Sequence, residues 1–303
     1  MAGRLDWLGV IRGRFLLLAL ACVALGIAVS QGARPLDGHF VLDALLVLLG
    51  ALAAHAGVNA LNEYSDYRSG LDQQTVRTPF SGGSGTLVAQ PQHLGKALSL
   101  GLGCVALTAA IGLYFLIRQP ALASSLAPLG AVGLALVLAY TPWLTRRPWL
   151  CLLAPGLGFG PLMVLGTQIV LAGQATVSGA LLSLVPFFLC NNLLLLNQFP
   201  DIDADRAVGR LTLPMLLGRR RAVTVLGVQW LLAFGGLLLC VLAGRVPAGA
   251  AVGLLAAPLA LRAWQLLRRD PEAADCLLPA MGLNVAISVL TPLLMAVGMV
   301  FGG

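Results

Sequence analysis

The sequence predicts an all-α protein that crosses a membrane nine times and forms a single bundle over residues 1–303. Two observations carry this prediction. Hydrophobic residues make up 58% of the chain and charged residues only 10%, with a mean hydropathy of +0.90, whereas soluble domains carry about 25% charge. The chain also repeats apolar stretches near the roughly 20 residues that a helix needs to cross a bilayer. We place these stretches at residues 14–31, 40–62, 97–117, 121–141, 149–172, 178–197, 222–244, 247–267 and 277–301.

Taken in order, these stretches are separated mostly by short turns. The first, 14–31, is too long for the apolar core of a secretory signal peptide, so we expect a retained helix. Turns at Pro120 and Val246 divide two long apolar runs. Only the connections 63–96 and 198–221 are long, and each begins at a cluster of acidic residues. Long loops on a rigid scaffold are common places for chemistry.

The basic residues predict the orientation of the bundle. With the N-terminus in the cytoplasm, the inside segments hold 16 of the 19 arginines and lysines, and the outside segments hold only Arg34, Arg118 and Arg245. Cytoplasmic segments are typically enriched in such residues. Both acidic clusters are therefore expected at the cytoplasmic face. The net charge of +7 is explained by this topology and by anionic lipid, so we expect a lipid bilayer and no nucleic acid as a partner.

The two acidic clusters hold six of the chain's 12 acidic residues. They are N-E-Y-S-D-Y-R-S-G-L-D at 62–72 and N-Q-F-P-D-I-D-A-D at 197–205. Both begin Asn-x-x-x-Asp, and the second lies 135 positions after the first. This recurrence suggests an internal duplication of a helix and its loop. The first motif region extends as a loop to residue 96, and the second motif, 197–213, extends to residue 221.

Helical spacing gathers each cluster on one face. The second helix would present His55, Asn59, Asn62 and Asp66, and the sixth would present Asn197, Asp201 and Asp205. Hard oxygen ligands of this kind suit Mg²⁺, which also binds substrate phosphates. Without a cation, crowded carboxylates repel one another and their pKa values rise. A phosphate clamp could be completed by the arginines of the same segments, Arg68, Arg77, Arg206 and Arg210.

Other polar residues have simpler interpretations. We interpret Asp43, Glu63 and Asp203 as solvated or ion-paired carboxylates. His55 fits a hydrogen-bonded interior histidine as well as a cavity residue, and the S-G-G-S-G run at 81–85 fits either a phosphate cradle or a mobile lid. The six cysteines show no metal or redox spacing, so we assign them to packing.

The two motifs resemble those of the UbiA superfamily of membrane prenyltransferases, and the resemblance spans nearly the whole chain. Residues 62–72 are similar to the family pattern N-D-x-x-D-x-x-x-G-x-D. The segment D-I-D-A-D-R-A-V-G-R-L-T-L, 201–213, is similar to D-x-x-x-D-R-x-x-G-K-x-T-L. The spacing is similar to that of the menaquinone branch, which prenylates 1,4-dihydroxy-2-naphthoate. Glu63 in place of Asp, Pro200 in place of Arg, and a missing second arginine after Thr78 depart from the pattern.

The resemblance implies a nine-helix bundle in a bacterial inner membrane, with a central cavity opening at the cytoplasmic side. It implies Mg²⁺-dependent transfer of a polyprenyl group from an isoprenyl diphosphate to an aromatic acceptor. The implied metal ligands are Asn62, Asp66, Asp72, Asn197, Asp201 and Asp205. The implied diphosphate-binding residues are Arg68, Arg77 and Arg210, and the implied catalytic residues are Asp66, Asp201, Arg77 and Arg210. His55 and Asn59 would line the substrate cavity.

Two other functions remain open at this level. A terpene cyclase on the same fold would capture the allylic cation within one substrate. A membrane transporter would also use intramembrane acids and repeats, although here the acids cluster at one face and most helices carry almost none. The sequence leaves open the acceptor, the prenyl chain length, the proton acceptor and the oligomeric state.

Overall fold

The computed structural model describes residues 6–302, and in that range it contains helices and no strand. Eight helical segments are long and apolar enough to cross a membrane. They are α3 (Gly38–Ser69), α6 with its leading turn (Pro91–Arg118), α7 with its leading turn (Pro120–Ala139), α8 to α9 (Pro148–Ala172), α10 (Val177–Asn197), α13 (Arg219–Leu242), η6 with α14 (Ala248–Arg269) and α15 (Ala274–Phe301). The shorter apolar helix Gly13–Val29, which contains α2 (Leu17–Val29), takes the first of the nine predicted positions. The predicted all-α membrane bundle is confirmed.

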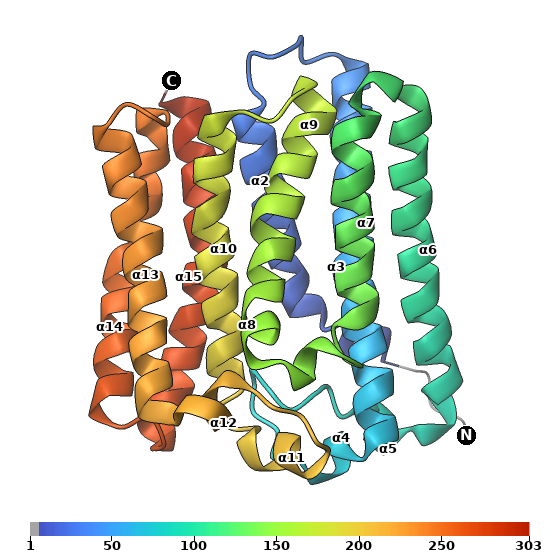
Figure 1. Ribbon diagram of the computed structural model, residues 1–303, viewed down its shortest axis with the longest axis vertical. Helices are drawn as coiled ribbons and strands as arrows, with labels where there is room; N and C mark the ends of the chain where they lie inside the picture. The colour runs from blue at the N-terminus through green and yellow to red at the C-terminus, as the bar shows by residue number, and fades with distance from the viewer. Residues whose placement is uncertain (1–5, 303) are drawn as a thin grey trace.

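Short helices gather at one end of the bundle, which we call the motif end (Figure 1). They are α4 (Leu71–Gln74), α5 (Thr86–Ala89), α11 (Ile202–Ala207) and α12 (Leu213–Leu217). Two more short helices are α1 (Trp7–Val10) and the 3₁₀ turn η4 (Leu144–Arg146). Both predicted acidic clusters therefore lie at the same end of the molecule.

The interior of the bundle centres on α10, which packs against α8, α13 and α15. A buried amide network joins three of these helices. Asn192 donates to the Leu226 carbonyl at 2.9 Å, and Gln229 donates to Asn192 Oδ1 at 2.8 Å. Asn284 donates to the Asn192 carbonyl at 2.9 Å. Such interhelical hydrogen bonds fix helix pairs where lipid supplies no hydrophobic driving force.

The opposite side of the bundle is more open. α3 and α6 pack closely along Gly57 and Gly101, but α7 (Ala123–Ala139) has no buried residue. In Figure 1, α6 and α7 stand on one side, α13 to α15 stand on the other, and α8 to α10 lie between them. α7 lines one side of the cavity described below.

The span from α8 (Pro148–Leu157) to α9 (Gly166–Ala172) contains a π-helical segment, η5 (Gly158–Leu165). Pro155 and Pro161 each remove a backbone donor from this span. On the side of the span that faces α10, the Gly156 N–H of α8 donates to Asn191 Oδ1 of α10 at 2.8 Å. The wider π turn therefore faces the cavity while its back is held on α10. Such segments occur often at functional sites.

The structure corrects one feature of the second cluster. We expected Asn197, Asp201 and Asp205 on one continuous helix, but α10 ends at Asn197 and α11 begins at Ile202. Pro200 explains the break, because it has no N–H to donate and its ring opposes a helical carbonyl four residues earlier. By contrast, α3 continues past the predicted residue 62 to Ser69 and ends at Gly70, whose φ of 81° favours glycine.

Candidate functional site

The motif end opens into a cavity of about 680 Å³. Residues of both acidic clusters line its mouth. From there it continues between α3, α6, α7 and η5, along apolar side chains that reach Phe115 and Leu126. The space therefore combines a polar mouth with a long apolar interior.

The first cluster reaches the cavity from two elements. Asn62 and Asp66 lie on the last turns of α3, and Asp72 lies on α4 after the reversal at Gly70. Asp66 and Asp72 are buried. Asn62 donates through Nδ2 to Thr141 Oγ1 at 3.2 Å. The predicted face of α3 therefore forms, and the turn at Gly70 adds Asp72 to it.

The second cluster reaches the cavity from the end of α10 and from α11. Asn197, Asp201 and Asp205 all line it, even though they do not share one helix. Asp203 does not line the cavity. It is exposed and pairs with Arg206 at 3.0 Å, which agrees with its interpretation as an ion-paired carboxylate.

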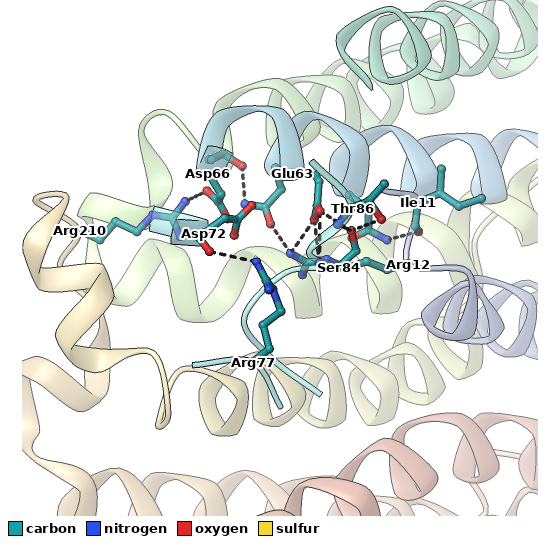
Figure 2. Close-up of polar contacts among 12 residues, drawn as sticks. Ile11, Arg12, Glu63, Asp66, Asp72, Arg77, Ser84, Thr86 and Arg210 are labelled. Carbon is teal, nitrogen blue, oxygen red and sulfur yellow. Dashed lines mark hydrogen bonds and ion pairs between the residues drawn. The ribbon is translucent and has the colours of Figure 1, made fainter. Parts of the chain in front are cut away.

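Arg210 joins the two clusters. Its guanidinium donates to Asp66 Oδ1 of the first cluster (Figure 2). It also donates to Asp205 Oδ1 of the second cluster at 3.1 Å. The Arg210 side chain is only 14% exposed. A largely buried cation thus lies between two buried carboxylates at the cavity mouth.

Arg12 is a site residue that sequence reasoning missed. Its Nη2 donates to Asn62 Oδ1 at 2.9 Å and lies 4.0 Å from Glu63 Oε2. The segment is fixed to α3 because Asn59 Nδ2 donates to the Ile11 carbonyl at 2.9 Å. The sequence contained no signal for this role, since Arg12 was one of several basic residues in a topological count.

Glu63 was expected to be solvated or ion-paired. It is fully buried and lies 4.0 Å from the Arg12 guanidinium, so the ion-paired interpretation fits. It also accepts hydrogen bonds from the backbone N–H and the hydroxyl of Ser84. The glycine-rich run 81–85 is therefore held against α3 (Figure 2). Its Gly83 passes so close to Asp72 that a β-carbon there would meet Asp72 Oδ1 at 2.7 Å.

The other predicted arginines lie farther out. Arg77 is exposed and donates at 3.2 Å to the backbone carbonyl of Asp72, a cavity residue, without lining the cavity itself. Arg68 is exposed, donates to the Tyr64 hydroxyl at 3.1 Å and lies over its ring. Arg68 contacts Tyr64 and does not line the cavity in this structure, so its role in the diphosphate clamp stays a prediction.

Burial and mutual repulsion set the electrostatics of the mouth. Burial, followed by repulsion from Glu63 and Asp66, raises the pKa of Asp72 to about 7. Burial, followed by repulsion from Asp205, likewise raises the pKa of Asp201 to about 7. The ionised forms of these two carboxyls are therefore unfavourable unless a cation compensates their charge.

Buried oxygen atoms without partners test whether these residues suit a metal. Among residues 6–302, Asp72 Oδ2, Asn197 Oδ1 and Asp201 Oδ1 are buried and accept no hydrogen bond. No group of three or more acidic, histidine or cysteine side chains in that range is close enough to hold an ion alone. Mg²⁺ commonly takes one or two carboxylates and completes its shell with water and substrate phosphate. The donor set therefore fits Mg²⁺ bound together with a phosphate group.

Comparison with known proteins extends this description. The model of the UbiA prenyltransferase family matches residues 16–299. The chain is 32% identical to a protein of Mycobacterium tuberculosis named 1,4-dihydroxy-2-naphthoate octaprenyltransferase, over 87% of this chain and 86% of that one.

Two solved structures share the fold. A UbiA homologue from Aeropyrum pernix K1 superposes with a TM-score of 0.67 at 19% identity, over 96% of this chain and 98% of that chain. A UbiA homologue from Archaeoglobus fulgidus, bound to DMAPP and Mg²⁺, superposes with a TM-score of 0.60 at 15% identity, over 96% and 99%. Together with the two motifs at the cavity mouth, the family match leads to one conclusion: the chain belongs to the UbiA prenyltransferase family and is an integral membrane prenyltransferase.

Proposed function

We propose that this enzyme uses Mg²⁺ to transfer a polyprenyl group from an isoprenyl diphosphate to an aromatic acceptor, and that the acceptor is 1,4-dihydroxy-2-naphthoate. The observation that carries the proposal is the set of unpartnered oxygens of Asp72, Asn197 and Asp201 at the mouth of an apolar cavity. The diphosphate head of an isoprenyl diphosphate fits the polar mouth, and its apolar tail fits the cavity interior.

Six side chains would hold the metal, namely Asn62, Asp66, Asp72, Asn197, Asp201 and Asp205. Mg²⁺ bound there would neutralise the diphosphate and make it a better leaving group. Arg12 and Arg210 lie in the same mouth and would stabilise charge on the departing diphosphate. Arg77, which bonds to the Asp72 backbone carbonyl, and Arg68 would add positive charge near the diphosphate. Arg210, which now pairs with Asp66 and Asp205, would exchange a carboxylate for phosphate oxygen.

The apolar interior serves the other half of the reaction. The prenyl tail would lie along α3, α6 and α7, where it buries apolar surface. Loss of diphosphate leaves an allylic cation, which water would capture if it were present. A cavity walled by aliphatic and aromatic side chains excludes that water.

The choice of acceptor rests on the curated relatives. The Mycobacterium tuberculosis relative carries a name that specifies 1,4-dihydroxy-2-naphthoate and an octaprenyl group. That match covers 87% of this chain and 86% of the relative. We therefore extend that acceptor to this enzyme, while the length of its donor remains a matter for measurement.

We place the motif end at the cytoplasmic face of a bacterial inner membrane. The arginine count supports this orientation. In the structure Arg34 and Arg118 both pair with the buried Asp43. Asp43 lies near the start of α3, whose other end carries the first acidic cluster. A soluble aromatic acid made in the cytoplasm would then meet the cavity mouth directly.

The test is product formation by the purified enzyme in liposomes, with Mg²⁺, polyprenyl diphosphates of several lengths and a panel of aromatic acceptors. Asp66→Ala and Asp201→Ala should each lower kcat/KM by about 10²-fold or more, because each removes charge that supports the leaving group. Asp203→Ala is the matched control and should retain activity, since Asp203 is exposed and pairs only with Arg206.

Full activity of either cavity variant would refute the assignment. Diphosphate release without any acceptor, giving a hydrocarbon or terpene alcohol, would favour a cyclase. Substrate flux across the liposome without chemical turnover would favour a transporter.

A further inference from the structure

The membrane section of the cavity contains one histidine without a hydrogen bond. His55 lies on α3, lines the cavity and is only 6% exposed. Its Nδ1 is buried and has no partner among residues 6–302. Leaving such a group unpaired destabilises the protein unless a ligand or water supplies the missing bond.

The donor's tail cannot supply that bond, because an isoprenoid chain has no polar group. The other polar side chains in this section need no ligand, since their hydroxyls bond to their own helices. Thr108 donates to the Cys104 carbonyl at 3.0 Å, and Thr167 donates to the Met163 carbonyl at 2.6 Å. His55 therefore points to a second substrate that carries a polar group.

Asn59 lies one helical turn from His55, toward the mouth. Its Nδ2 is engaged by the Ile11 carbonyl, which orients the amide and leaves Oδ1 without a hydrogen bond among the described residues. Asn59 also lines the cavity. Two hydrogen-bond acceptors, an imidazole nitrogen and an amide oxygen, thus belong to residues separated by a rise of about 6 Å along one helix face.

An aromatic wall completes this part of the cavity. The ring of Phe159 meets the His55 ring edge to face, with centroids 4.7 Å apart. Phe159 belongs to the π segment η5, whose Gly160 sits directly against the backbone of α10. Phe15 also lines the cavity and packs in the same cluster as Phe159. Aromatic side chains in this arrangement favour another aromatic ring.

We propose that His55 and Asn59 bind the two ring hydroxyls of a 1,4-dihydroxy aromatic acceptor, whose ring packs against Phe159. Each hydroxyl donates a hydrogen bond, one to the free nitrogen of His55 and one to Asn59 Oδ1. His55 lies seven residues, about 10 Å, from Asn62 along α3. The ring therefore sits beside the reacting end of the donor. This inference rests on the proposed function and adds the residues that select the acceptor.

The test compares the dihydroxy acceptor with its two mono-O-methyl ethers, each of which lacks one donor. The wild-type enzyme should prefer the dihydroxy acceptor in kcat/KM by about 10–100-fold, because the ether leaves a site acceptor unpaired. His55→Leu should raise KM for the acceptor and abolish discrimination against one ether. Asn59→Leu should abolish discrimination against the other, and His55→Gln should restore part of the lost preference.

Two controls separate the outcomes. Ser99→Ala changes a hydroxyl that bonds to the Gly95 carbonyl at 3.0 Å and does not line this cavity, so it should leave the preference intact. The KM for the donor should stay constant in all variants. Unchanged discrimination in a folded His55→Leu enzyme would refute this inference, as would an effect on the donor alone. If His55→Leu does not fold, the discrimination of Asn59→Leu between the dihydroxy acceptor and the two ethers tests the inference instead. Failure of the wild type to prenylate any aromatic acceptor would instead refute the proposed function.

Discussion

Among residues 6–302, Arg12 is the one non-glycine residue with a positive φ, 51°. Such a conformation destabilises an L-residue by about 1–2 kcal/mol, and strain of this kind persists mainly at functional sites. The strained turn ends α1 and carries the guanidinium to Asn62. The strained turn therefore lowers stability while it places the Arg12 guanidinium beside Asn62. The following comparison measures both effects.

We predict that Arg12→Gly is more stable than Arg12→Ala by about 1 kcal/mol, because both remove the charge and only glycine removes the strain. Both variants should lose donor kcat/KM to a similar extent. Thermal unfolding and steady-state kinetics measure the two effects separately. Equal stability of the two variants would show that the turn relaxes without glycine, and unchanged kinetics would remove Arg12 from the diphosphate site.

A second prediction concerns pH. The pKa values of Asp72 and Asp201, each about 7, lie above the ordinary value of 3.8. Between pH 4 and 7 the folded, metal-free protein retains protons that the unfolded chain releases, so its stability should fall as pH rises through this window.

The affinity for Mg²⁺ should change with pH in the opposite direction to the stability of the metal-free protein, because the carboxyl ligands must lose their protons to bind the ion. Its affinity should rise from pH 6 to pH 8 by about tenfold for each of the two carboxyls. Calorimetric titration in buffers of different ionisation enthalpy would count the protons released. An affinity that does not change between pH 6 and pH 8 would contradict the raised pKa values.

Most of the site could be predicted at this scale, and the exceptions have physical causes. Asn62 and Asp66 follow from helical spacing alone. Arg12 does not, because tertiary structure brings it to a residue 50 positions away. Arg68 has the same charge as Arg210 and lies beside Asp66 in sequence, yet its helix position turns it toward Tyr64. Spacing predicts which face a residue occupies only within one helix.

At the scale of elements, close helix contacts give a stability prediction. A β-carbon on Gly156 would collide with Asn191 Oδ1 and with the Phe187 carbonyl of α10. Gly156→Ala should therefore separate α8 from α10 and destabilise the protein by about 1–3 kcal/mol. Gly103→Ala is the matched control, because a β-carbon there meets nothing within 4 Å. Thermal unfolding in detergent measures both, and equal midpoints would refute the close packing.

The elements also show where local rules fail. The apolar runs locate the membrane helices because length and hydropathy decide that property. The break after Asn197 was signalled by Pro200, although the repeated Asn-x-x-x-Asp spacing favoured a continuous helix. The missing N–H of Pro200 ends the helix there, even though the spacing pattern is compatible with a continuous helix. The π segment η5 was not predictable, since it depends on how Gly156 and Gly160 meet α10.

For the whole molecule, hydropathy predicts insertion but not the position of a helix within the bundle. α10 and α7 are both strongly apolar, yet 67% of the α10 window is buried and none of the α7 window is. Lipid tails and protein interiors are equally apolar. Burial therefore follows from small residues and polar contacts, such as those of Asn192, and not from hydrophobicity.

α7 forms one wall of the substrate cavity and buries none of its residues in the protein. Its outer surface must then be supported by acyl chains, so the lateral pressure of the surrounding lipid acts directly on the cavity wall. Softer or thinner surroundings, including a detergent micelle, should let this helix move outward and widen the tail channel. The bilayer therefore helps to support the cavity wall, and we expect the preference of the enzyme among donors of different length to change with the thickness of the surrounding membrane.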